Sequence, residues 1–459
     1  MVCSFYKKES KLKSLSKSTY IMFLFDSMLL FFSTLLTATY FDFSRMTALL
    51  AAVLVVVTGL ISVFLHGDYK IREFNPTFWN FYRVFESMIF AHIPVGIFIY
   101  FFLDKTVLVK FLCLNIFIIY ITTCIYRLCF HYYLMNFKKI KNILILGTDE
   151  RAKIIADEIQ NKYALKMNVA GFVQDKNTDE FINDSKIPVF AEPESLKNII
   201  KDNKIDVVLI AQPTELILTV PKGIKIYKMP DFYEMVTGKY YIDEKTVTEL
   251  YYQYATHRSS FYDFSKRVYD IIAALIIMTV TLPITAYIAI RVKLTDGASP
   301  IYTQTRVGRD GKTFECYKLR TMYVNDYVPK DSDDVKYAES VKGDDRIIPF
   351  CRFIRKARLD EIPQMINILK GEMSIVGPRA EWVDEVKIFK EKIPYYSCRM
   401  WVKTGWTGWA QINQGHLFSV DDEAGKLAYD LYYIKHRNVI WEISILVKAV
   451  FMALGGRHD

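Results

Sequence analysis

The chain has 459 residues, of which 52% are hydrophobic and 15% aromatic. That length allows two or three domains, and the aromatic content is high for a soluble protein. Because charged residues still make up 24% of the sequence, the apolar residues must be gathered in segments. The formal net charge of +9 favours an anionic partner, which could be nucleic acid, a membrane surface or a phosphorylated substrate. The seven Cys residues form no CxxC pair, so we expect reduced thiols and neither a disulfide framework nor a zinc site.

Four apolar stretches occupy the first part of the chain, at residues 20–40, 46–66, 81–103 and 107–130. Each has about the 20 residues that a helix needs to cross a bilayer. Basic residues gather before the first stretch, between the second and third, and after the fourth, whereas the other two connections are short and poor in base. By the positive-inside rule, the N-terminus and the chain after Lys138 are therefore cytoplasmic. These patterns predict a transmembrane four-helix region over residues 1–137.

Two acids inside these stretches, Asp26 and Glu86, would be costly in lipid. Each could mark a functional site, and a contact between helices inside the bundle explains them at least as well. The sequence leaves both interpretations open.

Strands and helices alternate over residues 138–240. "KNILILGTDERAKIIADEIQ" is typical of a buried strand, a turn at Gly147 and a helix, and "NVAGFVQD" and "IDVVLIAQ" continue the alternation. This pattern predicts a small Rossmann-like parallel α/β domain, followed by a linker over residues 241–263. A dinucleotide-binding fingerprint needs three glycines at the first turn, and only Gly147 is present there. A structural or regulatory module is therefore favoured over a bound cofactor.

A further apolar stretch follows at residues 264–293, and Val268–Ile290 is long enough to span a membrane. However, Pro283 interrupts it and base flanks both ends, with Lys266 and Arg267 on the N-terminal side. A fifth crossing would place the rest of the chain outside, against this charge symmetry. A helix bent at Pro283 that enters one leaflet and returns satisfies both flanks. We therefore predict a re-entrant helix hairpin, with an ordinary fifth span as the alternative.

The chain after Lys293 is polar and mixed, with many glycine-containing turns. Near the C-terminus, "NVIWEISILVKAVFMAL" is an apolar helical run that carries charges at Glu442 and Lys448. It is too interrupted for a span and suits a helix lying at the membrane interface.

Two adjacent acids, Asp360 and Glu361, come two residues before Pro363. Proline is tolerated in a first helical turn, so the acids fall at a helix N-terminus, where capping is the simplest interpretation of a carboxylate. The basic residues around them favour chemistry instead, because cations attract phosphates and a neighbouring carboxylate can act as nucleophile or Mg²⁺ ligand. The same base could attract anionic lipid. The basic residues are Lys318, Arg320, Arg352, Arg355, Lys356, Arg358 and Arg379.

Residues 264–459 resemble the catalytic domain of the bacterial sugar transferases, the monotopic polyprenyl-phosphate glycosyl-1-phosphate transferases. Five motifs carry the resemblance in the family's order: "KRVYD", "YTQTRVGRDGKTFECYKLRTM", "DDRIIPFCRFIRKARLDEIPQMINILKGEMSIVGPR", "GWTGWAQIN" and "YDLYYIKHR". The complete chain resembles the family's long form, which acts in capsule, exopolysaccharide or O-antigen initiation. The fold that this implies is a four-helix transmembrane bundle, a small Rossmann-like (CoA-binding-like) α/β domain and a mixed α/β catalytic domain with a re-entrant helix hairpin.

The resemblance implies transfer of a sugar-1-phosphate from a UDP-sugar to undecaprenyl phosphate, with release of UMP, at the cytoplasmic face of the bacterial inner membrane. Asp360 would attack the β-phosphate and carry the sugar-phosphate, and Glu361 would bind Mg²⁺. We expect glucose or galactose as the sugar, with an N-acetylated sugar as the alternative. The expected partners are nucleotide sugar, lipid bilayer and undecaprenyl phosphate, without nucleic acid, and a homo-oligomer is left open. The residues expected to bind substrate phosphate are Arg355, Arg379, Lys318, Arg320, Arg346 and Gln364, and those of the re-entrant helix are Lys266, Arg267, Asp270 and Pro283.

The sequence departs from the family's pattern in two motifs. The family's PRP reads Pro378-Arg379-Ala380, and its R-P-G-x-T-G-W-A-Q begins with Lys403 and Thr404 here. Lysine keeps the charge of arginine but loses its bidentate fork, so details of nucleotide or sugar recognition are in question.

Two other functions compete with this reading. A membrane-anchored nucleotide-sugar dehydratase or epimerase would need a glycine-rich NAD loop, which is missing, and a Tyr-x-x-x-Lys pair, which Tyr241 and Lys245 match. A non-catalytic scaffold for polysaccharide assembly would leave the LDE and VGPR motifs without a role.

Overall fold

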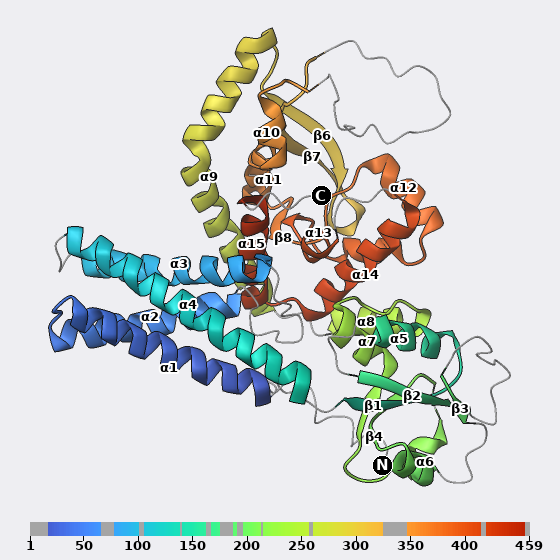
Figure 1. The fold of residues 1–459 in the computed structure, drawn as a ribbon. Coiled ribbons are helices and arrows are strands. Elements are labelled where there is room, and N and C mark those ends of the chain that lie inside the picture. The colour runs from blue at the N-terminus through green and yellow to red at the C-terminus, as the bar shows by residue number, and fades with distance from the viewer. Residues whose placement is uncertain are drawn as a thin grey trace. The chain divides into compact units, whose positions relative to one another are not determined.

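The structure is a computed structural model of residues 1–459, which forms two compact units, Met1–Met229 and Pro230–Asp459. Figure 1 shows the helices and strands of both units, coloured along the chain. The described residues are 17–65, 78–100, 105–137, 140–161, 167–174, 187–190, 196–212, 214–256, 260–324, 347–414 and 419–454.

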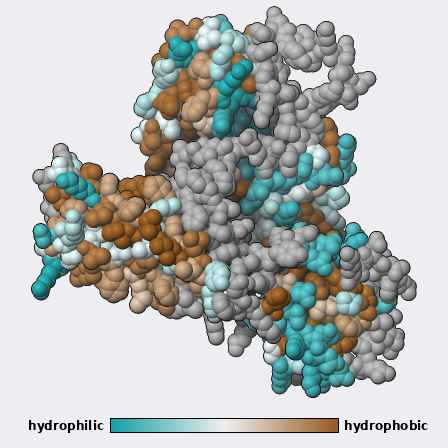
Figure 2. Space-filling model, in the orientation of Figure 1, coloured by the Kyte–Doolittle hydropathy of each residue, from teal (hydrophilic) through white to brown (hydrophobic). Residues whose placement is uncertain are grey.

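The first unit begins with four apolar helices at the predicted stretches. Leu30, Val55 and Phe111 belong to their shared buried core. Many outward side chains are apolar as well, and Figure 2 shows these hydrophobic residues over the four helices. Helices that are apolar on both faces suit a lipid environment, and the segments Met22–Tyr40 and Thr106–Phe130 are long and apolar enough to cross a membrane. The helices are α1 (Lys17–Tyr40), α2 (Arg45–Leu65), α3 (Phe78–Tyr100) and α4 (Lys105–Phe137).

Asp26 lies between α1 and α4 rather than in contact with lipid. Arg127 Nη2 is 3.4 Å from Asp26 Oδ2, and both side chains are 2% exposed. Tyr126 also donates a hydrogen bond to Asp26. These contacts favour the helix-contact interpretation of Asp26, while the side chain of Glu86 lies outside the described residues.

The first unit continues with a parallel five-stranded sheet in the order β3-β2-β1-β4-β5, which confirms the predicted Rossmann-like architecture. Leu144 and Leu146 of the central strand are fully buried, as the apolar run predicted. At the turn after β1, Gly147 has a φ of +117°, and an added Cβ would lie 3.2 Å from Ala211 Cβ. The strands are β1 (Lys141–Leu146), β2 (Met167–Val173), β3 (Val189–Phe190), β4 (Ile205–Ile210) and β5 (Lys225–Lys228), and the helices are α5 (Glu150–Asn161), α6 (Leu196–Asp202) and η4 (Glu215–Thr219).

The second unit is a mixed α/β fold around one large core. An antiparallel hairpin pairs Ile301 with Leu319, and two short parallel strands pair Ser374 with Gly405. The elements up to the first parallel strand are α7 (Met229–Thr237), α8 (Glu244–Thr256), α9 (Ser260–Asp296), β6 (Ile301–Val307), η5 (Arg309–Gly311), β7 (Thr313–Leu319), α10 (Cys351–Lys356), η6 (Leu359–Glu361), α11 (Gln364–Lys370) and β8 (Ser374–Val376). The remaining elements are α12 (Val383–Lys392), η7 (Tyr396–Trp401), β9 (Gly405–Thr407), α13 (Trp409–Asn413), α14 (Val420–His436) and α15 (Val439–Leu454).

The stretch predicted as a linker, 241–263, contains α8 and the start of α9. Val247 and Leu250 of α8 are buried in the core of the second unit. Just before α8, the Tyr240 N–H donates to the Ala428 carbonyl at 2.8 Å. Because burial of apolar side chains stabilises their attachment, α8 is part of the folded unit and not a free connection.

The helix α9 is continuous and contains Pro283. Near its N-terminal end, Asp270 accepts hydrogen bonds from Ser374 Oγ and Ile375 N, each at 3.0 Å. At its C-terminal end, Asp296 pairs with Arg320. Its middle is exposed and apolar, and Figure 1 shows it bowed outward between two ends that lie against the unit. The path of α9 in the membrane stays a prediction.

Candidate active site

Asp360 and Glu361 lie in η6, a tight turn between α10 and α11. Arg358, the residue before this turn, has a left-handed φ of 53°, which few residues other than glycine adopt. Such backbone strain is frequent at functional sites. The N-cap position of α11 is taken by Pro363, which makes no side-chain capping bond. Capping of α11 therefore does not explain the two acids.

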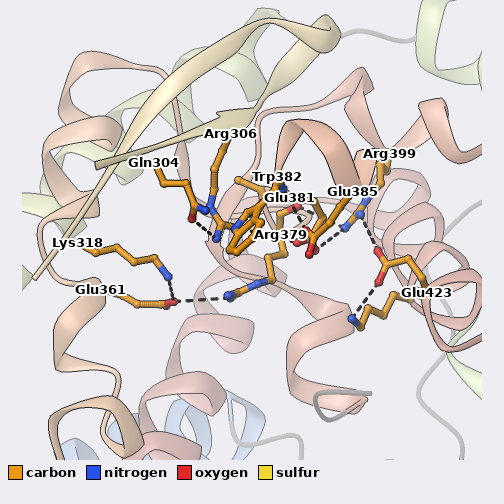
Figure 3. A network of polar contacts seen from close by, with 12 residues as sticks. Gln304, Arg306, Lys318, Glu361, Arg379, Glu381, Trp382, Glu385, Arg399 and Glu423 are labelled. Carbon is orange, nitrogen blue, oxygen red and sulfur yellow. Dashed lines mark hydrogen bonds and ion pairs between the residues drawn. The ribbon is translucent and has the colours of Figure 1, made fainter. Parts of the chain in front are cut away.

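Glu361 is buried and held by two cations. Its Oε1 atom is 2.9 Å from Lys318 Nζ and 3.7 Å from Arg379 Nη1 (Figure 3). Burial opposes ionisation, but Lys318 and Arg379 hold the pKa of Glu361 well below its usual range. The carboxylate is therefore ionised at neutral pH.

Asp360 has a different environment, although it is the adjacent residue. It is half-buried and makes no ion pair with any described residue. Burial, with repulsion from Glu361, raises the pKa of Asp360 to about 6 against the attraction of Lys318. At neutral pH it is mostly ionised, and its oxygens are not committed to a cation. Two neighbouring carboxylates with such different environments suit two different roles.

A hollow beside Glu361, which we call the basic hollow, is open to solvent, and the space between its walls, open solvent included, is about 230 Å³. Cations and apolar side chains share its walls. Its lining residues are Arg306, Cys316, Lys318, Glu361, Gln364, Met373, Arg379, Ala380, Gly405 and Trp406.

Three glycines allow the VGPR and GWTG segments to cross at this hollow. An added Cβ at Gly377 would lie 2.4 Å from Lys403 O, and one at Gly405 would lie 2.1 Å from Gly377 N. An added Cβ at Gly408 would lie 2.2 Å from Gly377 O. Since no side chain tolerates such distances, only glycine permits this close backbone approach. The crossing brings Arg379 and Trp406 to the same hollow.

A buried ionic network supports the segment that carries Arg379. Arg399 is 4% exposed, and its guanidinium is 2.9 Å from Glu423 Oε1 and 2.8 Å from Asp430 Oδ2. Its Nη2 also donates to the Arg379 carbonyl at 3.4 Å. Glu423 and Asp430 are seven residues apart on α14 and so share one face, a signal that could have indicated this network from the sequence.

The structure brings together four of the predicted residues and separates others. Lys318, Glu361, Gln364 and Arg379 line the basic hollow, and Arg355 acts on Asp360 through its charge. The other residues of the hollow, none of which was predicted to bind substrate, are Arg306, Cys316, Met373, Ala380, Gly405 and Trp406.

Arg320 does not line the basic hollow. Its guanidinium lies 2.5 and 2.6 Å from the two carboxylate oxygens of Asp296, and its Nε donates to Ser299 O at 2.7 Å. It therefore fastens β7 to the end of α9. Arg346 lies outside the described residues.

The predicted residues of the membrane helix hold α9 to the rest of the unit. Lys266 Nζ is 2.7 Å from Glu442 of α15, and it also lies 3.0 Å from Asp270 within α9. Arg267 donates to the carbonyls of Ile368 and Leu369, near the C-terminal end of α11, at 2.6 and 2.7 Å.

The acids of η6 have the chemistry of a magnesium site that shares its ion with a substrate. Among the described residues, no three His, Cys, Asp or Glu side chains converge on one point. Mg²⁺ in phosphate chemistry typically takes one or two carboxylates and completes its coordination with water and phosphate. Glu361 and Asp360 fit that requirement.

The turn after β1 does not fit a bound phosphate group. Asp149 Oδ1 accepts the Ala152 N–H at 3.1 Å, so a carboxylate occupies the start of α5. A phosphate at a helix N-terminus would need those free N–H groups.

Comparison with known proteins places these features in one family. Residues 261–456 match the family described as "Bacterial sugar transferase", and residues 64–227 match "CoA-binding domain". The UDP-N-acetylgalactosamine-undecaprenyl-phosphate N-acetylgalactosaminephosphotransferase of Aeromonas hydrophila is 34% identical over 233 residues, which are 51% of this chain and 53% of that protein. The undecaprenyl-phosphate galactose phosphotransferase of Salmonella typhimurium is 30% identical over 343 residues, 68% of each chain.

A third relative is the UDP-glucose:undecaprenyl-phosphate glucose-1-phosphate transferase of Escherichia coli, 37% identical over 188 residues. These cover 40% of this chain and 39% of that protein. The chain thus spans about half the length of the Aeromonas relative and two thirds of the Salmonella relative. The chain belongs to the bacterial sugar transferase family, as its motifs predicted.

Proposed function

We propose that the chain transfers a sugar-1-phosphate from a UDP-sugar to undecaprenyl phosphate and releases UMP. The observation that carries the proposal is Glu361, which lines a hollow together with three cations, and the adjacent Asp360 in the same turn, which does not itself line the hollow. The three relatives named above are undecaprenyl-phosphate sugar phosphotransferases by name, for N-acetylgalactosamine, galactose and glucose. UDP-glucose or UDP-galactose is the proposed donor, and an N-acetylated sugar is the alternative.

Asp360 is the proposed nucleophile. One carboxylate oxygen attacks the β-phosphorus of the UDP-sugar, and the bond from that phosphorus to the bridging oxygen breaks. The electron pair leaves with the bridging oxygen on UMP, and the sugar-phosphate stays on Asp360. An oxygen of undecaprenyl phosphate then attacks the same phosphorus and restores the free carboxylate. Two half-reactions let one site receive two bulky partners in turn.

The surrounding cations supply what phosphoryl transfer mainly requires, which is positioning and neutralisation of charge. Lys318 and Arg379 keep Glu361 ionised. Both also line the hollow in which the substrate is proposed to bind. Glu361, with Asp360 beside it, would hold Mg²⁺, which neutralises phosphate charge when it is bound. Gln364 offers an amide to the same hollow.

The proposal includes a cytoplasmic site at the inner membrane, with α9 entering the bilayer and returning. A straight helix of its 37 residues would be about 55 Å long, more than a bilayer's hydrocarbon core. Its two ends are nevertheless bonded to the same unit, through Asp270 and Asp296. A bowed path keeps both ends on one face of the membrane. There the lipid phosphate and a soluble nucleotide can meet.

Release of UMP by the purified full-length protein tests the function. We expect release from UDP-glucose or UDP-galactose, and turnover only when undecaprenyl phosphate is present. Asp360→Asn should abolish both turnover and any covalent sugar-phosphate adduct, because an amide is a poor nucleophile. Asp310→Asn, at an exposed turn with a side chain 61% exposed, is the matched control. Turnover by Asp360→Asn at the wild-type rate would exclude the proposed mechanism.

A further inference from the structure

Arg306 enters the basic hollow from β6 and is 6% exposed. Its Nη2 donates to Gln304 Oε1 at 3.0 Å, and its Nη1 donates to the Ala380 carbonyl. Its guanidinium carbon also lies 5.8 Å from the centre of the Trp382 ring. These contacts fix the plane of the guanidinium, while Nε is buried with no hydrogen-bond partner among the described residues.

The charge of Arg306 is poorly neutralised by the protein itself. Among the described residues, Arg306 pairs with Glu381 Oε2 at 4.0 Å, and Glu381 also faces Arg399 at 3.8 Å. Burial, with repulsion from Arg379, lowers the pKa of Arg306. A buried cation without a close counter-ion is costly, so such a site is stabilised by an anion that arrives with a ligand.

The lining of the hollow has an excess of positive charge. Arg306, Lys318 and Arg379 are its three cations, and Glu361 is the one carboxylate among the lining residues that the structure describes. Figure 3 shows that Arg306 and Gln304 lie apart from the Lys318–Glu361 pair, with Arg379 reaching toward Glu361. The cations of the hollow therefore lie in two places, with Lys318 and Arg379 beside Glu361 and Arg306 away from it.

We propose that Arg306 binds the phosphate that leaves with UMP. The proposal rests on the proposed transfer from a UDP-sugar and adds a residue to it. Because Glu361 is next to the nucleophile Asp360, the β-phosphate belongs on that side, which leaves the α-phosphate for Arg306. When Asp360 attacks the β-phosphorus, the bridging oxygen departs on the α-phosphate with its electron pair. UMP thereby gains one negative charge, which Arg306 neutralises.

The test measures UMP binding and kinetics with the full-length protein in lipid nanodiscs. We expect Arg306→Gln to weaken UMP inhibition about tenfold or more and to raise the KM for the UDP-sugar, because a charge-assisted hydrogen bond is lost. The KM for undecaprenyl phosphate and the weak inhibition by uridine, which has no phosphate, should not change. Lys312→Gln is the matched control, because Lys312 is an exposed cation directly after the turn η5 that follows β6.

Since Arg306 also bonds to Ala380, the unfolding temperature without nucleotide is measured for each variant. If Arg306→Gln is strongly destabilised, Arg306→Lys replaces it, and it should show a smaller loss of UMP affinity because the charge stays while the fork is lost. Unchanged UMP affinity in a folded variant would overturn the assignment. A wild-type protein that releases no UMP from any UDP-sugar, yet binds UMP through Arg306, would instead overturn the proposed function alone.

Discussion

Two adjacent carboxylates carry different chemistry here because their neighbours differ. Glu361 is bonded to Lys318 and faces Arg379, whereas Asp360 has no such partner among the described residues. Residue type alone could not separate the two roles. The separation depends on β7 and the segment after β8, which are distant in sequence from η6.

Removal of the Glu361 charge should change the Mg²⁺ dependence of turnover and leave the nucleophile Asp360 in place. We expect Glu361→Gln to retain its fold and to need a Mg²⁺ concentration about tenfold higher or more for half-maximal turnover, because one charged ligand is lost. The measurement is UMP release over a Mg²⁺ titration, with EDTA abolishing activity of the wild type. Glu391→Gln, on the exposed face of α12, is the control. An identical Mg²⁺ dependence in Glu361→Gln and the wild type would argue against Glu361 as the ligand.

The residues that the sequence could indicate at this site are those inside short motifs. The spacing of Asp360, Glu361 and Arg379 and the basic residues around them indicate that they belong to a phosphate-binding site. Arg306 also lies inside a motif, but its role cannot be read there, because its partner Ala380 comes from another segment. Arg399 lies outside the motifs, and its partners come from α14. Arg320 misleads for the same reason, since its pairing with the end of α9 cannot be read from its neighbours.

At the scale of elements, the crossing of the VGPR and GWTG segments should be intolerant of any side chain. Gly377→Ala would place a Cβ 2.4 Å from Lys403 O, so the backbone must shift. We expect a loss of unfolding free energy of about 1–3 kcal/mol or more, and lost UMP release because Arg379 moves. Thermal unfolding and activity are both measured.

Gly425→Ala is the contrasting variant. It lies within α14, where the nearest atoms to an added Cβ are at the end of the Gln414 side chain, at 3.2 Å, and not in the backbone. Alanine in a helix interior gains about 0.5–1 kcal/mol over glycine, so this variant should be neutral or slightly stabilised. Equal stability of the two variants would contradict the account of the crossing.

Helix α15 shows that composition can predict that a helix forms without predicting what surrounds it. Its apolar run with Glu442 inside suggested a helix at the membrane interface. In the structure Glu442 is completely buried. Its charge is compensated there by Lys266, 2.7 Å away, and by the hydroxyls of Tyr262 and Tyr433, which donate to it at 2.6 and 2.7 Å. The strand and helix periods were correct for β1 and for α1–α4, whereas the partners of a buried charge required the fold.

At the scale of the whole molecule, the proposed path of α9 places the chain before it and the chain after it on the same, cytoplasmic side of the membrane. We expect single cysteines placed at Gly311 and at Lys390, both in the second unit, to be protected from membrane-impermeant thiol reagents in intact cells. Both should react after the cells are opened. A cysteine in the connection between α1 and α2, at Asp42, should react in intact cells and serves as the control. Labelling at Gly311 from outside would show that α9 crosses the membrane.

The boundary between the two units determines how much of the chain the site needs. The family match begins at residue 261, yet Tyr240, Val247 and Leu250 are buried in the core of the second unit. A chain that starts at Pro230 should therefore release UMP and unfold near the temperature of the full chain.

A chain that starts at Phe261 removes α7 and α8 and exposes the core that they cover, at a cost of about 1.5–3 kcal/mol for each buried apolar side chain. We expect it to aggregate or to unfold at least 10 °C lower, by about 4 kcal/mol or more. Both chains retain α9, so a difference in membrane insertion cannot account for the contrast. Equal stability and activity of the two chains would show that α7 and α8 are dispensable, despite the packing of α8 in this core.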